Sequence, residues 1–136
     1  MYSYKYLEHT SDLYIEGAGS NLSEAIESVA QGMFNSISSS CVLGTKEYVE
    51  FSENGINLQD LIINIFTRVL AEMDASSKTA CNLEVLSLDE STFSSKVRIT
   101  LCKSESTKLH VKAATFHGFS IIRKGGSISL RVLFDI

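Results

Sequence analysis

Carboxylate groups that could bind a cation stand near both ends of the 136-residue sequence. Asp12 follows a polar turn, and Asp135 directly precedes Ile136, whose main-chain carboxylate is a further oxygen donor. Three carboxylates brought together suit hard divalent cations, calcium or magnesium, better than zinc or copper. The charge pattern alone favours a simpler interpretation, in which Asp12 caps a turn and the terminus is free in solvent.

The hydrophobic pattern before Asp135 argues against a free terminus. Apolar residues alternate with others almost to the last position: Ile128, Leu130, Val132 and Phe134. This two-residue period is typical of a strand with one buried face. We therefore expect the terminus to be docked in a sheet, with Arg131 and Asp135 on the face opposite the core.

The same alternation occurs in two other segments. The residues expected on the buried face are Leu13, Ile15, Leu109, Val111 and Ala113. The opposite face then carries Asp12 in the first segment and Lys112 in the second, because neighbouring strand residues point to opposite faces. Three segments thus offer a charged residue to the face that helices do not cover: Asp12, Lys112 and Asp135.

Two segments have the 3.6-residue periodicity of amphipathic helices. Residues 22–37 and 58–73 each carry one continuous apolar stripe. Asn21 precedes the first stripe and Glu24 follows three residues later, as in a capping box. Asn57 precedes the second stripe and is expected to be its N-cap residue, whose side-chain oxygen accepts from a free backbone amide of the first turn. Each helix should lie on a sheet.

Most of the remaining sequence has the pattern of strands. The strands expected are 2–7, 13–16, 47–52, 81–88, 92–101, 108–116, 119–124 and 128–134. Gly125 and Gly126 predict a two-residue hairpin between the last two. Strands in close succession favour antiparallel pairing. We predict one α+β domain over residues 1–136, in two layers, with one largely antiparallel sheet and two helices packed on one face.

The composition excludes several classes of protein. The chain is 44% hydrophobic and 21% charged, an ordinary globular composition. A net charge of −4 and a pI of about 5.3 give no basic footprint, so we expect no strong direct nucleic-acid binding. No apolar run suits a membrane span, and we expect no signal peptide because the first residues lack an apolar stretch. We expect a cytoplasmic protein, or a nuclear one in a eukaryote, without membrane contact.

The histidines and cysteines show no ligand spacing. The histidines are interpreted as structural: His9, His110 and His117. The cysteines are widely spaced without a CxxC pair: Cys41, Cys81 and Cys102. This spacing predicts neither a zinc knuckle nor a disulfide framework, and it favours a reducing compartment. We expect the cysteines to be small buried or loop residues.

Three segments resemble the archease family. Residues 7–12 (LEHTSD) with 19–25 (GSNLSEA) resemble its E/D-H-T-A-D turn and G-x-T/S-L-x-E-A helix start. Residues 111–117 (VKAATFH) are similar to its V-K-A-x-T-Y-H strand, and 134–136 (FDI) to its terminal F/I-D-I. The blocks lie in the family's order and span essentially the whole chain.

This resemblance implies a non-enzymatic cofactor of an RtcB-type tRNA-splicing ligase. Such a ligase joins RNA 3′-phosphate or 2′,3′-cyclic phosphate ends to 5′-hydroxyl ends with GTP and a divalent metal. An archease promotes guanylylation of the ligase's active-site histidine and repeated turnover. The resemblance also implies a bound divalent cation, calcium or alternatively magnesium or manganese, at Asp12, Asp135 and Ile136, and a role for Lys112 in ligase activation.

The sequence departs from the family pattern in two places. Residues 61–70 lack the family's tryptophan and carry Arg68 where an acidic residue is usual, which would alter a ligase contact on that helix. Ser11 replaces the commoner alanine in the turn.

Two alternative functions remain open. One is a metal-dependent phosphate-ester hydrolase that uses Asp12, Asp135 and His117. The other is a general protein-binding chaperone or adaptor that acts through a sheet edge.

Overall fold

The computed structural model describes residues 2–42 and 44–136. These residues form seven strands and two helices, and every strand pair is antiparallel. The elements are β1 (Ser3–Leu7), β2 (Asp12–Gly19), α1 (Leu22–Ile37), β3 (Glu47–Asn54), α2 (Leu58–Ser76), β4 (Thr79–Asp89), β5 (Ser94–Cys102), β6 (Ala113–Lys124) and β7 (Ser127–Asp135). The α+β class and the antiparallel pairing are confirmed.

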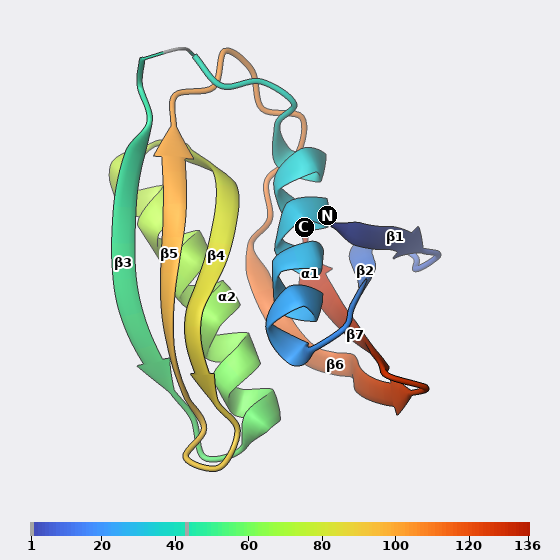
Figure 1. Cartoon of the computed structure of the whole chain (residues 1–136). Coiled ribbons are helices and arrows are strands. Elements are labelled where there is room, and N and C mark those ends of the chain that lie inside the picture. Colours follow the sequence, from blue (N-terminus) through green and yellow to red (C-terminus); the bar gives the residue numbers. More distant parts are fainter. Residues whose placement is uncertain (1, 43) are drawn as a thin grey trace.

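The strands form two sheets, so the expectation of one sheet is wrong. A four-stranded sheet has the order β1-β2-β7-β6, and a three-stranded sheet has the order β3-β5-β4 (Figure 1). The chain leaves β5 and crosses to the end of α1, where the Lys108 amide donates to the Ile37 carbonyl at 2.7 Å. It enters β6 in the other sheet only at Ala113. Alternation along a strand does not reveal which strand it pairs with.

Both helices pack against both sheets, which is how the two sheets share one core. Helix α1 contacts β1, β2 and β7 of the larger sheet and β4 of the smaller one, and α2 contacts β6 and all three strands of the smaller sheet. Phe66 of α2 packs edge-on against Phe134 of β7, with ring centroids 5.5 Å apart. Phe134 is fully buried. The expected docking of the C-terminal strand is confirmed.

The helix starts are as the sequence predicts. The Asn21 side chain accepts from the Glu24 amide at 2.9 Å, and that of Asn57 accepts from the Asp60 amide at 2.8 Å. These contacts satisfy amides that have no partner within the helix. Helix α2 continues past the predicted end to Ser76. Neither helix is long and apolar enough to span a membrane.

The strand predicted at 108–116 is shorter and continues into the next one. β6 starts at Ala113 and runs without interruption to Lys124, and its pairing with β7 is irregular between Thr115 and Ser120. Ala114 pairs with Phe134, so Ala114 and not Ala113 lies on the core face. The hairpin at 125–126 is confirmed, with positive φ at both glycines.

A disulfide joins Cys41 and Cys102, which contradicts the expectation from cysteine spacing. Their Cα atoms lie 5.7 Å apart although 61 residues separate them in sequence. The loop that follows α1 runs past the end of β5, where the Val42 amide donates to the Lys103 carbonyl at 2.7 Å. This contact joins segments that are far apart in the sequence, so no local sequence pattern predicts it. The cysteine spacing therefore no longer supports a reducing compartment.

Candidate functional site

The larger sheet brings the two predicted aspartates opposite each other. Asp12 is the first residue of β2, Asp135 is the last residue of β7, and the two are Cα partners in the antiparallel register. Directly opposed residues of an antiparallel pair project to the same face, with Cβ atoms about 4.5–5.5 Å apart. The backbone pairing therefore sets the approach of these carboxylates.

The end of β7 is also held on its other side. Ala113 of β6 is the second register partner of Asp135, and the Lys112 amide donates to the Asp135 carbonyl at 2.8 Å. Lys112 precedes β6 instead of lying within the expected strand, and its side chain is exposed. Ile136, 36% exposed, follows Asp135 at this same edge. All four predicted site residues therefore belong to one end of the sheet.

A histidine that the sequence analysis regarded as structural contacts this site. Nδ1 of His9 lies 3.0 Å from Oδ2 of Asp12. The His9 ring also packs edge-on against Tyr14, with centroids 5.9 Å apart. His9 lies in the turn that resembles the family's H-T-A-D segment, which was the one signal pointing to it. It orients Asp12 and is the residue that sequence reasoning missed.

The opposed aspartates differ from the next charged pair along the same strands. Glu16 faces Arg131 across β2 and β7, with 2.8 Å between Oε1 and Nε, and Lys5 lies 3.3 Å from its other oxygen. Partial burial alone would raise the pKa of Glu16, but hydrogen bonds from Arg131 and Lys5 lower it overall. This cross-strand pair is neutralised within the chain.

The aspartates at the end of the strands have a different environment, in which His9 is the one side chain at ion-pair distance among the described residues. Within residues 2–42 and 44–136, neither Asp12 nor Asp135 has a lysine or arginine at ion-pair distance. Like charges directly opposite each other on paired strands are destabilising. A hard divalent cation would offset this repulsion, and the donors offered, two aspartates and the main-chain carboxylate of Ile136, are all oxygens. The residues present fit such an ion.

His117, the third residue of the alternative hydrolase site, is not brought together with the two aspartates. His117 lies in the irregular part of β6 and is exposed. Across the described chain, three potential ligand side chains of His, Cys, Asp or Glu converge only at the cysteines. Asp12, Asp135 and His117 therefore do not form the three-residue centre that a hydrolase of this kind needs.

Comparison with known proteins identifies the family of this chain. The model of the Archease protein family (MTH1598/TM1083) matches residues 4–136. The chain belongs to the archease family. The archease-like protein of Drosophila melanogaster is 27% identical over 143 residues, which cover 98% of this chain and 90% of that protein. The archease of Sulfurisphaera tokodaii is 27% identical over 140 residues, covering the whole of both.

Two solved structures show the same fold. The solution structure of Methanobacterium thermoautotrophicum protein 1598 has a TM-score of 0.69 and 22% identity, and covers 98% of both chains. The crystal structure of an archease from Thermotoga maritima, described as a possible chaperone, has a TM-score of 0.66 and 22% identity, and covers 97% of this chain and 96% of that one.

One departure from the archease pattern has an explanation within the fold. Arg68 of α2 pairs with Glu72 at 3.0 Å and with Glu53 of β3 at 3.4 Å. Its guanidinium also lies 5.0 Å from the centroid of the Phe51 ring. In this member of the archease family, the residue therefore ties α2 to the three-stranded sheet, and its charge is compensated by two glutamates.

Proposed function

We propose that this protein is a non-enzymatic cofactor of an RtcB-type tRNA-splicing ligase in the cytoplasm. It promotes guanylylation and repeated turnover of the ligase through a divalent cation, calcium in the first place, at Asp12, Asp135 and Ile136. Membership of the archease family supports the choice of partner. The observation that carries the proposal is the direct pairing of Asp12 with Asp135, two like charges without a lysine or arginine at ion-pair distance among the described residues.

The side chains have distinct roles in this proposal. Bound by few protein ligands, the cation supplies positive charge and keeps coordination positions open toward the partner. Asp12 and Asp135 present their oxygens from paired strand ends, and His9 fixes the orientation of Asp12. Phosphoryl transfer depends mainly on positioning and charge neutralisation, so a helper protein needs no nucleophile of its own. Lys112, whose backbone amide donates to the Asp135 carbonyl, adds an exposed lysine side chain at the same end of the sheet.

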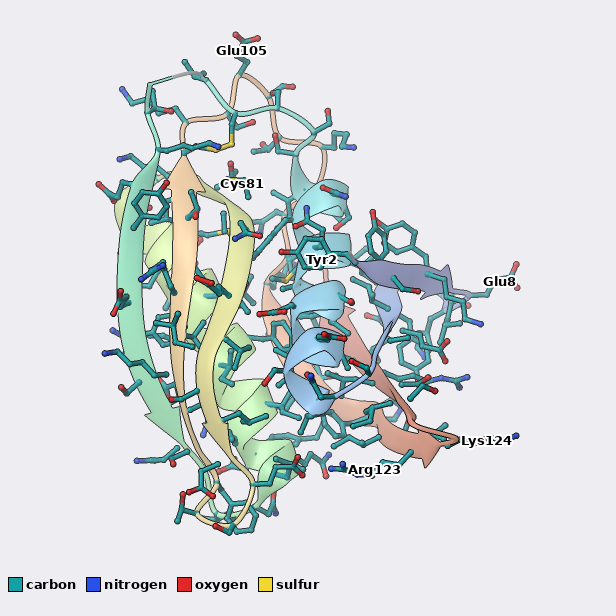
Figure 2. The ribbon with its side chains drawn as sticks, viewed as in Figure 1. Tyr2, Glu8, Cys81, Glu105, Arg123 and Lys124 are labelled. Atoms are coloured by element: carbon teal, nitrogen blue, oxygen red, sulfur yellow. A yellow bond between two sulfur atoms is a disulfide. The ribbon has the colours of Figure 1, made fainter. Side chains whose placement is uncertain are left out.

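The test is a guanylylation assay of the purified cognate ligase with labelled GTP, with and without this protein and with the metal varied. We expect the wild-type protein to stimulate guanylylation and to permit many turnovers. Asp12→Ala and Asp135→Ala should lose stimulation while their circular dichroism is unchanged. Glu105→Ala is the matched control, an exposed carboxylate in the loop between β5 and β6 (Figure 2). Full stimulation by both aspartate variants would refute the proposal.

The role of Lys112 is tested separately. Lys112→Ala should reduce ligase stimulation but leave calcium binding unchanged, since the ammonium group acts on the partner and not on the cation. Lys124→Ala, at the exposed β6–β7 hairpin, is the control and should behave as wild type (Figure 2). Equal stimulation by the Lys112 and Lys124 variants would remove Lys112 from the activating surface.

A general chaperone is the second candidate, because a similar structure is described as that of a possible chaperone. Suppression of aggregation of an unrelated unfolded protein measures this activity directly. The ligase proposal predicts no suppression at concentrations that saturate ligase stimulation. Strong suppression that persists in Asp12→Ala would favour the chaperone instead.

A further inference from the structure

All three cysteines of the chain meet at one place. Cys41 lies in the loop after α1, Cys81 in β4, and Cys102 at the end of β5. Their three Sγ atoms all lie within 4.8 Å of one another. In Figure 2 the Cys81 label lies just below the yellow sulfur–sulfur bond of the disulfide. The disulfide uses only Cys41 and Cys102, so it does not explain why Cys81 lies beside them.

A break in strand pairing accompanies the placement of Cys81. Ala80 pairs with Leu101, and the next pair is Asn82 with Thr100, so Cys81 is an extra residue without a partner on β5. Such a β-bulge re-aims a side chain and is frequent next to functional sites. A regular strand would have had no surplus residue here.

The sulfur cluster borders a solvent-accessible cavity of about 510 Å³. Cys41 and Cys81 are in its wall, together with Lys46 and Tyr48, while Cys102 is fully buried behind them. Thr79 Oγ1 lies 3.9 Å from the Cys102 sulfur, where a hydroxyl can donate to a thiolate. The cluster therefore has an entry path, a neighbouring cation and a hydrogen-bond donor.

We propose that Cys41, Cys81 and Cys102, once the disulfide is reduced, form a three-thiolate site for a thiophilic d¹⁰ cation such as Zn²⁺. Thiolate sulfur is the ligand that selects such ions. Zn–S bonds of about 2.3 Å put the sulfurs of a tetrahedral site roughly 3.8 Å apart, a spacing this cluster reaches with small side-chain shifts. The fourth position faces the cavity and is open to water.

Reduction of the Cys41–Cys102 disulfide precedes binding of the cation. A dithiol reductant gives two electrons to the Cys41–Cys102 disulfide and itself becomes a disulfide, which leaves two protein thiols. The cation then displaces the thiol protons into solvent. Burial raises the pKa of the Cys81 thiol, and Lys46 offsets this only in part. In the oxidised protein two of the three ligands are unavailable.

Cobalt is the probe, because thiolate ligation to Co²⁺ produces charge-transfer absorption and zinc then displaces the cobalt. In the reduced protein, kept free of oxygen, the thiolate-to-cobalt absorption should saturate at one equivalent of cobalt per three-cysteine site. Cys81→Ser, which keeps both disulfide cysteines, should lose at least tenfold in affinity. The control Ser39→Ala, at the wall of the same cavity, should give the same thiolate-to-cobalt absorption as wild type.

The outcomes are decisive in either direction. Thiolate-to-cobalt absorption in the reduced protein but not in the oxidised protein, weakened in Cys81→Ser, supports the site. Absence of thiolate-to-cobalt absorption in the reduced protein overturns it. Undiminished affinity in Cys81→Ser also overturns it, because a site with two cysteines would then suffice. Neither result depends on the ligase, so failure here leaves the proposed function intact.

Discussion

The molecule has two clusters of potential ligands, each at strand ends but in different sheets. Asp12 and Asp135 meet at the end of the four-stranded sheet on an exposed edge. Cys41, Cys81 and Cys102 meet at the end of the three-stranded sheet beside a cavity. Carboxylates at an edge favour a hard cation, and half-buried sulfurs favour a soft one. The two proposed sites therefore differ in the cation that they would prefer, because their side-chain types and burial differ.

The clusters also differ in how they behave without a cation. The aspartates repel each other and have no lysine or arginine partner among the described residues. Two of the cysteines form a covalent bond with each other, and the third is kept as a thiol by burial. We therefore expect the opposed aspartates to lower the stability of the protein without a cation, and the disulfide to raise it. Four predictions test this contrast, from the largest expected effect to the smallest.

Loss of the disulfide should have the largest effect on stability. A cross-link that spans 61 residues is worth about 4 kcal/mol in the loop-entropy model. We expect reduction in the presence of a chelator to lower the free energy of unfolding by roughly this amount, measured by urea titration. Cys81→Ser is the control and should keep the oxidised protein's midpoint. An unchanged midpoint on reduction would mean that the disulfide does not contribute to stability.

Removing one acidic charge should affect activity and stability in opposite directions. Asp135→Asn keeps the side-chain shape but removes the repulsion with Asp12. Ligase stimulation should fall at least about tenfold, the lower end of losses at metal sites. Stability in chelator should rise by a few tenths of a kcal/mol, within the range for cross-strand pairs. A drop in stability together with full stimulation would contradict both halves of the account.

The helix caps test whether the two clusters belong to one cooperative unit. Asn21→Ala and Asn57→Ala should each cost about 1 kcal/mol. Because α1 and α2 each contact both sheets, the loss should lower the stability of both regions together. Unfolding followed by far-ultraviolet circular dichroism and by Cys81 thiol reactivity should then coincide. Separate transitions would show that the two sheets unfold independently.

The neutralised pair beside the aspartates should have the smallest effect. The pKa of Glu16 is lowered in the folded state, so its stabilisation is present above its ordinary pKa and is lost as pH falls through the lowered value. Glu16→Gln should flatten the pH dependence of stability below about pH 4.5, by less than about 1 kcal/mol because the partners are partly exposed. Denaturant titrations between pH 2 and pH 6 measure this difference. An identical acid profile in both proteins would remove Glu16 as its source.

Features encoded by neighbouring residues were predictable from the sequence. The caps at Asn21 and Asn57 depend on contacts three residues away, and the hairpin at 125–126 depends on two glycines. Alternation correctly placed Asp12 and Asp135 on one face because a two-residue period is a property of the strand itself. The family resemblance then selected these two carboxylates from the others.

Features that depend on distant pairing were not predictable. The division into two sheets is decided by where the chain crosses after β5, and alternation carries no information on that crossing. The Cys41–Cys102 disulfide and the bulge at Cys81 arise from strand register across tens of residues. The contact of His9 with Asp12 depends on the shape of a turn, so the composition of the turn suggested it only weakly.

Direct measurement of calcium binding tests the central claim, that the acidic edge is a cation site. Calorimetric titration should use the oxidised protein, in which the sulfur cluster is blocked by the disulfide. We predict binding by the wild type and by Glu105→Ala, and at least a tenfold loss of affinity in Asp12→Ala. Equal calcium affinity in all three proteins, or no binding by the wild type, would contradict the account.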